Sequence, residues 1–173
     1  CMAVSPSSIA VPTHLYLPQW LRVLGLVLLA VYVLLVAFIV LWPTHVDDNS
    51  SGRYVLMFLH TGHSQGWLPL WFTYQTVEWL SNVVMFVPGG FLMALLFERI
   101  RLWVPLLAFA TTCGVESTQY FMPGRTSSVW DIVANTLGGT VGWGCALFLL
   151  WTVNTLRILR NKRSRRGLMG KTH

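Results

Sequence analysis

The chain has 173 residues, of which 54% are hydrophobic and only 10% are charged, and its formal net charge is +6 at pH 7. A soluble domain usually carries about 25% charged residues, so this composition excludes an ordinary soluble globular domain and indicates a membrane protein. Most of the positive charge lies in residues 157–171, directly after an apolar segment. We therefore expect this basic tail to bind anionic lipid headgroups, and we expect no nucleic-acid partner.

Four apolar segments are long enough to cross a bilayer as helices, which takes about 20 residues each. They cover about residues 21–42, 79–97, 102–120 and 132–153. We predict an all-α, integral membrane four-helix bundle. The predicted organisation is an N-terminal segment at 1–20, a membrane domain at 21–156 and a basic cytoplasmic tail at 157–173.

The connection at 43–77 is too polar to span a bilayer and is predicted to form an outer loop. It ends in Trp67-Leu-Pro-Leu-Trp71-Phe72, and such aromatic side chains are typical of a membrane interface. A lid over the outer face is the alternative for this segment. His60 and His63 have a spacing that could chelate a metal, but no clear Cys, Asp or Glu completes a ligand set nearby. We therefore predict no metal site and no cofactor.

The distribution of arginine and lysine orients the predicted helices. Arg99 and Arg101 lie between the second and third helices, and the basic tail follows the fourth. Arg22 precedes the first apolar run. All these positions are expected in the cytoplasm, so both termini are predicted to be cytoplasmic in a multi-pass protein of the bacterial cell membrane.

Polar residues recur at the predicted outer ends of three helices. In chain order they are Glu78, Asn82, Glu116, Gln119, Asp131 and Asn135, with Arg125 in the short loop between the third and fourth helices. Residues three or four apart in a helix share a face, so the two residues of each pair are expected to point the same way. An ionisable group at membrane depth is costly and usually faces a partner, a cavity or a substrate path. We therefore interpret these residues as the candidate functional site.

Three interpretations of this polar set stay open. The first is structural, with Arg125 paired to an acid and the amides joining helices by hydrogen bonds. The second is a binding site in which Arg125 holds a phosphate or carboxylate and the amides meet hydroxyl groups. The third is catalysis, with Glu116 as general acid or base and Asp131 or Arg125 assisting. No serine, cysteine or histidine forms a convincing nucleophile and base pair, so the balance favours a protein that is not an enzyme.

Small residues in the fourth segment predict close helix packing. Gly138 and Gly142 are four apart, a pattern that lets the backbones of two helices approach. This would bring the fourth helix against the third or second. The same residues would equally serve a homo-oligomer interface, so the oligomeric state stays open. Cys113 and Cys145 lie inside apolar segments, where a thiol behaves as a small hydrophobe rather than as part of a disulfide framework.

The motifs together resemble those of the VanZ-like integral membrane proteins of bacteria. They are Asn82-Val-Val-Met-Phe-Val-Pro88-Gly-Gly90-Phe91, Val115-Glu116-Ser-Thr-Gln119, Arg125 and Asp131-Ile-Val-Ala-Asn135-Thr-Leu-Gly138-Gly139. The likeness covers about residues 78–143. It implies that the polar positions within these motifs are this chain's version of a polar set shared by the family. Many relatives carry a further acid between the arginine and the aspartate, where this chain has Thr126-Ser127-Ser128-Val129-Trp130.

The resemblance also bears on function. The name-giving member of the family is associated with resistance to the glycopeptide teicoplanin, but the resemblance implies no reaction. We predict an outward-facing polar pocket that binds an envelope lipid, a peptidoglycan component or a glycopeptide. A membrane-embedded enzyme acting on a lipid-linked substrate, or a non-catalytic scaffold of a membrane complex, is the alternative.

Overall fold

The computed structural model describes residues 18–41, 50–122 and 128–169, and all regular structure in those ranges is helical. The elements in chain order are α1 (Gln19–Leu41), α2 (Ser50–Ser64), α3 (Tyr74–Leu96), the 3-10 helix η2 (Glu98–Trp103), α4 (Val104–Tyr120) and α5 (Val129–Met169). The predicted all-α class is confirmed. The helix α2 lies inside the connection at 43–77, for which the sequence predicted a loop.

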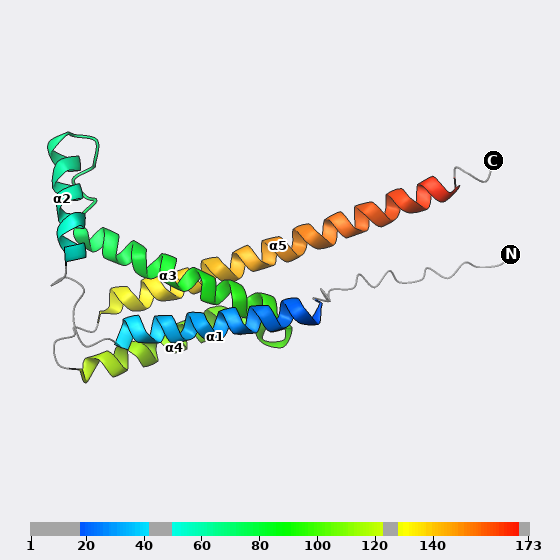
Figure 1. Ribbon diagram of the computed structural model, residues 1–173, viewed down its shortest axis with the longest axis horizontal. Coiled ribbons are helices and arrows are strands. Elements are labelled where there is room, and N and C mark those ends of the chain that lie inside the picture. The colour runs from blue at the N-terminus through cyan, green and yellow to red at the C-terminus, as the bar shows by residue number, and fades with distance from the viewer. Residues whose placement is uncertain (1–17, 42–49, 123–127, 170–173) are drawn as a thin grey trace.

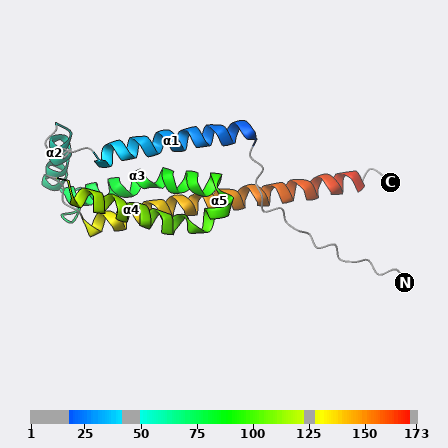
Figure 2. The same ribbon diagram turned by 90° about the horizontal axis from the view of Figure 1, so that it is seen from below.

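Four helices lie side by side, and one lies across their end. Figure 1 and Figure 2 show α1, α3, α4 and α5 along one direction, with α2 transverse to them. The most extensive interface joins α3 to α5, α4 also packs on α5, and α1 packs on α3. With 41 residues, α5 is about 61 Å long and extends well beyond its neighbours into the predicted basic tail.

Three helices are long and apolar enough to cross a membrane: Gln19–Val40 in α1, Tyr74–Leu96, and Val129–Asn161 in α5. The fourth predicted span corresponds to α4, which has 17 residues. Its length of about 25 Å is less than the roughly 30 Å of a bilayer's hydrocarbon core. By length and composition alone, three of the four predicted spans are therefore supported, and the crossing by α4 remains a prediction.

Local sequence signals account for where these helices begin. The main-chain N–H of Thr73 donates to Thr76 Oγ1 at 3.3 Å at the start of α3. Pro105 lies in the first turn of α4, where its missing N–H costs nothing. Ser128 precedes α5, and its Oγ accepts from the N–H of Trp130 at 3.2 Å, as an N-cap residue does.

Glycine brings α3 and α5 into backbone contact at the centre of the bundle. A Cβ on Gly138 would overlap the carbonyl oxygen of Val83, and one on Gly142 would overlap that of Val87. One turn further along α3, a Cβ on Gly90 would overlap the carbonyl oxygen of Gly139. The predicted close approach therefore occurs, and the partner helix is α3. In a membrane, where apolar side chains gain little by leaving lipid, such close packing joins helices.

The helix α1 is attached more loosely, because most of its side chains are exposed. The ring of Tyr32 lies over Gly89, and its hydroxyl donates to the main-chain oxygen of Met85 at 2.9 Å. Nearer the start of α1, Gly25 leaves space for the side chain of Leu96. These contacts hold one face of α1 against α3.

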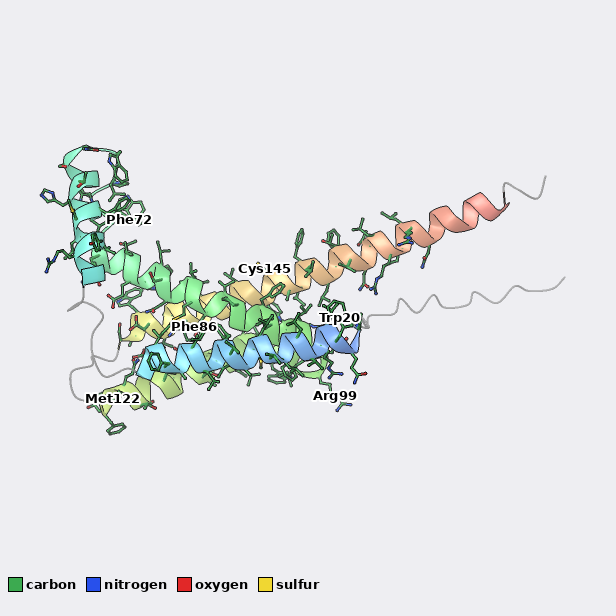
Figure 3. All side chains as sticks on the ribbon, viewed as in Figure 1. Trp20, Phe72, Phe86, Arg99, Met122 and Cys145 are labelled. Carbon is green, nitrogen blue, oxygen red and sulfur yellow. The ribbon has the colours of Figure 1, made fainter. Side chains whose placement is uncertain are left out.

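The bundle has an apolar end, where α1 and α5 extend past the other helices and η2 joins α3 to α4. Trp20 and Arg99 lie near this end in Figure 3. Ala94, Val104 and Ala146 from α3, α4 and α5 form a buried apolar cluster here. The guanidinium of Arg101 donates from Nε to the main-chain oxygen of Ala94 at 2.8 Å, which ties η2 to the end of α3.

Candidate functional site

The opposite end of the bundle, called here the polar end, is where α1 and α4 finish and α3 and α5 begin. Phe72 and Met122 lie at this end in Figure 3. Most of the polar residues selected from the sequence lie here, on α3, α4 and α5. The sections of chain that carry them are up to 57 residues apart, from Glu78 to Asn135, so the fold rather than local sequence brings them together.

The first polar contact joins α3 to α5. Asn82 donates from Nδ2 to Oδ1 of Asp131 at 3.0 Å, and the pair is partly buried. Asp131 is also in the first turn of α5. An acidic side chain in the first turn is favourably placed with respect to the helix dipole. The contact therefore ties the start of α5 to α3.

Glu116 of α4 is the most deeply placed acid that the structure describes. Its exposure is only 4%, and its Oε2 accepts from the main-chain N–H of Ser128 at 2.9 Å. Ser128 also caps α5, so this contact fixes the end of α4 against the start of α5. A carboxylate has room for about four hydrogen bonds. Burial of such a group costs free energy unless its partners compensate for lost water.

A second buried contact joins α4 and α5 one turn deeper. Asn135, which is 4% exposed, donates from Nδ2 to Oγ1 of the fully buried Thr112 at 2.9 Å. The other amide atom of Asn135, Oδ1, is buried and has no hydrogen-bond partner among the described residues. Native proteins contain few such atoms, and each calls for an explanation such as a water, an ion or a functional role.

Gln119 connects the polar end to α1. It is 6% exposed, and its Nε2 donates to the main-chain oxygen of Val40 at 2.9 Å. That carbonyl lies in the last turn of α1, where helical carbonyls have no partner within the helix. This amide therefore joins α4 to the end of α1.

Two predicted site residues are not included in the polar cluster as defined here. Glu78 lies one turn before Asn82 in α3, and its side chain is exposed. Arg125 was predicted to supply the positive charge of the site. It lies outside the described residues, three positions before Ser128. The polar cluster is therefore defined by Asn82, Thr112, Glu116, Gln119, Ser128, Asp131 and Asn135.

Sequence reasoning missed Thr112, Ser128 and the carbonyl of Val40. A signal was present for Thr112, which is four residues before Glu116 and shares its helix face. Ser128 precedes an apolar helix, which is typical of an N-cap, but nothing in the sequence indicates that its N–H reaches Glu116. A main-chain carbonyl carries no residue-type signal at all.

The chemistry of the polar cluster is dominated by acceptors. Glu116 and Asp131 provide carboxylate oxygens, and Asn135 provides an amide oxygen without a partner. Within the described ranges, no three His, Cys, Asp or Glu side chains come together as a potential metal site. Such a set of acceptors fits ligand groups that donate, such as hydroxyls, amides and amines.

Two shallow surface hollows lie away from this cluster. One is lined by residues of α1, including Trp20 and Val27. The other extends along α3 from Phe72 to Met85. Both are lined mainly by apolar side chains, and neither includes a member of the polar cluster. The cluster is a set of buried contacts between helices and not part of either hollow.

Comparison with known proteins gives two matches. A family model described as VanZ/LLP1 matches residues 27–151, a range that contains every member of the polar cluster. Protein VanZ of Enterococcus faecium is 26% identical over 123 residues, which are 70% of this chain and 72% of that protein. No solved structure matches.

Proposed function

The chain belongs to the VanZ/LLP1 family, as its motifs predicted, and from this premise we propose that it is a multi-pass protein of the bacterial cell membrane that binds an envelope molecule at its polar end. The ligand class that we propose is a lipid-linked or peptidoglycan-derived component, or a glycopeptide that binds such a component. All of these carry hydroxyl, amide or amine donors together with phosphate or carboxylate groups.

The proposed topology has four crossings with both termini in the cytoplasm. Arg99 and Arg101 lie at the apolar end, and the basic stretch of α5 extends beyond it. The excess of positive charge supports a cytoplasmic position for this end, and hence an external position for the polar end. The helix α4 packs against α5 throughout the bundle. Its 17 residues would be long enough to cross the bilayer if Trp103 and Tyr120 lay at the two membrane interfaces.

The observation that carries the proposal is the buried carboxylate of Glu116 on α4, one helical turn from Thr112, whose partner Asn135 has an unused buried acceptor. Close packing of α5 does not by itself call for a buried carboxylate, because glycine lets α5 approach α3 at Gly142 and Ala108 of α4 at Gly139. Polar groups retained at a cost in free energy are typical of sites that bind or react. Arg125 follows α4 in the chain and would supply the positive charge for a ligand phosphate or carboxylate.

The proposal is tested by teicoplanin susceptibility, because the name-giving relative is associated with resistance to that glycopeptide. A Gram-positive host would express wild type, Glu116→Gln or Arg125→Ala, with membrane levels matched by immunoblot. Glu116→Gln keeps the shape of the side chain and removes its charge. We expect protection with the wild type and loss of protection in both variants at equal protein level.

A matched control is available on the same helix. Ser117 is exposed, and its hydroxyl donates to the main-chain oxygen of Cys113 in its own helix, so Ser117→Ala should protect like the wild type. Equal protection by Glu116→Gln and the wild type would refute a role for the buried carboxylate. Loss of variant protein from the membrane would instead assign Glu116 a structural role. If no version protects, direct binding of lipid-linked peptidoglycan precursor to purified protein in nanodiscs becomes the test of the same site.

A further inference from the structure

The hairpin formed by α2 and residues 65–73, called here the α2 hairpin, exposes aromatic side chains on one side. Tyr54 and Phe58 are one helical turn apart and mostly exposed, and the ring of Trp67 stacks edge-on to Phe58 with 5.2 Å between centroids. Arg53 and His60, also exposed, lie on another side of α2, which they share with the exposed Leu56 and Met57. His60 follows Phe58 by two residues, which places it about 200° around the helix.

Internal contacts fix the shape of this hairpin. The N–H of Leu68 donates to the main-chain oxygen of Gly62 at 3.2 Å, and the Nε2–H of His63 donates to that of Pro69 at 3.1 Å. A Cβ on Gly62 would lie 2.8 Å from Cβ of Leu68, so glycine permits the returning segment to pack directly on α2. The aromatic side chains are therefore exposed on a segment with a defined structure.

The orientation of α2 indicates what its aromatic side contacts. Figure 1 shows α2 transverse to α1, α3 and α5, so it lies parallel to the membrane plane when these three helices cross a bilayer. It also lies beyond the ends of the bundled helices (Figure 2). In Figure 3, nitrogen-tipped side chains project from the side of α2 that faces away from the bundle, and aromatic side chains project from the opposite side of the hairpin.

We propose that the α2 hairpin is an interfacial element that binds the lipid surface at the polar end, with Tyr54, Phe58 and Trp67 at the boundary between headgroups and acyl chains. Aromatic residues favour this boundary, and a helix that lies across the bundle can present them to it. Arg53 faces the headgroup layer, where it meets lipid phosphates. The inference rests on the proposed membrane crossings and is independent of any ligand at the polar end.

A shallow groove continues this surface toward the bilayer centre. It is lined by Phe72 of the hairpin and by Val77, Leu80, Val84 and Met85 on α3. Ser81 also lines it, but its hydroxyl donates to the main-chain oxygen of Val77 at 2.8 Å. The groove thus offers an apolar path from the hairpin along α3, which suits the acyl chains of the same leaflet. Lipid contact is therefore continuous from α3 to the hairpin.

Spin labels on single cysteines test this placement in the full chain. The background replaces the native thiols as Cys1→Ser, Cys113→Ala and Cys145→Ala, and the protein is reconstituted in vesicles of phosphatidylcholine and phosphatidylglycerol. Labels are introduced by Tyr54→Cys and Phe58→Cys on the aromatic side and by Arg53→Cys and His60→Cys on the other. Collision with oxygen, which concentrates in lipid, is compared with collision with a water-soluble nickel chelate.

We expect the ratio of oxygen to nickel collisions to be several-fold higher for the two aromatic-side labels than for the other two. High nickel accessibility at all four positions would mean that the hairpin stands in water, and would overturn the proposal. Low accessibility to both reagents on the aromatic side would mean that protein covers it, which also overturns the proposal. Phe58→Cys removes one ring of the contact between Phe58 and Trp67 and could disturb the hairpin. Tyr54→Cys is the check on this, because Tyr54 is 73% exposed and takes no part in that contact. No ligand is present, so failure of the ligand proposal cannot produce these results.

Discussion

At the apolar end of the bundle, α3, α4 and α5 meet through Ala94, Val104 and Ala146, whereas at the polar end they meet through amides, carboxylates and hydroxyls. The apolar end joins its helices through small side chains, although Nη2 of Arg101 and Nε1 of Trp143 are also buried there without a hydrogen-bond partner among the described residues. The polar end differs because it buries the carboxylate of Glu116 and joins its helices through side-chain hydrogen bonds between groups that cost free energy to bury. We propose that this end serves ligand binding as well as helix association.

The largest effect is expected at the glycine contact between the two ends. In Gly142→Ala the new Cβ would overlap the main-chain oxygen of Val87, so α3 and α5 must separate. We expect a loss of about 3 kcal/mol in the free energy of unfolding, because a rigid backbone cannot yield as a side chain can. Thermal unfolding in nanodiscs would measure it.

Gly144→Ala is the matched control, because a Cβ on Gly144 would meet nothing within 4 Å. The same substitution there should be neutral or should stabilise α5 by up to about 1 kcal/mol through helix propensity. Equal unfolding temperatures for the two variants would contradict the backbone contact between α3 and α5.

A smaller effect is expected from breaking one polar contact. Thr112→Val removes the hydroxyl that accepts from Asn135 and leaves the whole amide buried without a partner. We expect a loss of about 1–3 kcal/mol, the usual cost of an unsatisfied buried group. Thr111→Val, at the exposed neighbouring position, should change the unfolding temperature little. If both valine variants unfold alike, the contact between Thr112 and Asn135 does not matter for stability.

The smallest effect is expected where α1 meets α3. Tyr32→Phe keeps the ring over Gly89 and removes the hydrogen bond to the main-chain oxygen of Met85. Hydrogen bonds between membrane helices average about 0.6 kcal/mol, so the unfolding temperature should fall only slightly. A loss larger than that of Thr112→Val would mean that α1 is more firmly attached than its exposure indicates.

The sequence predicted much of the bundle because apolar length and periodicity are strong signals. The helices α1, α3, α4 and α5 were all expected, and the glycine approach was expected from Gly138 and Gly142. The helix α2 was not predicted because residues 43–77 were assessed only for whether they could cross a bilayer. Tyr54, Met57, Phe58 and Thr61 in fact follow the spacing of one helix face. The extent of α5 was missed because its apolar pattern ends near Val153, whereas the helix continues to Met169.

The candidate site was predictable as a set of residues but not as a set of contacts. The sequence indicated Asn82, Glu116, Asp131 and Asn135 because each lies near a predicted helix end with another polar residue three or four positions away. The partners of these side chains depend on how helices rotate against one another, which no local pattern fixes. The structure shows that Gln119 donates to the carbonyl of Val40 and that Glu116 accepts from the N–H of Ser128. Neither partner could be identified from the sequence alone.

The most direct test of the contrast between the two ends replaces a whole polar pair by apolar residues of similar size. Thr112→Val combined with Asn135→Leu removes both the hydrogen bond and the unpartnered amide, and exchange of a buried polar pair for apolar residues is often neutral or stabilising. The measurement is the unfolding temperature of the double variant in nanodiscs, beside that of Thr112→Val alone. Our account predicts that the double variant unfolds at or above the wild-type temperature while the single variant unfolds below it. A double variant less stable than the single one would contradict the account, because the polar end would then hold the bundle together.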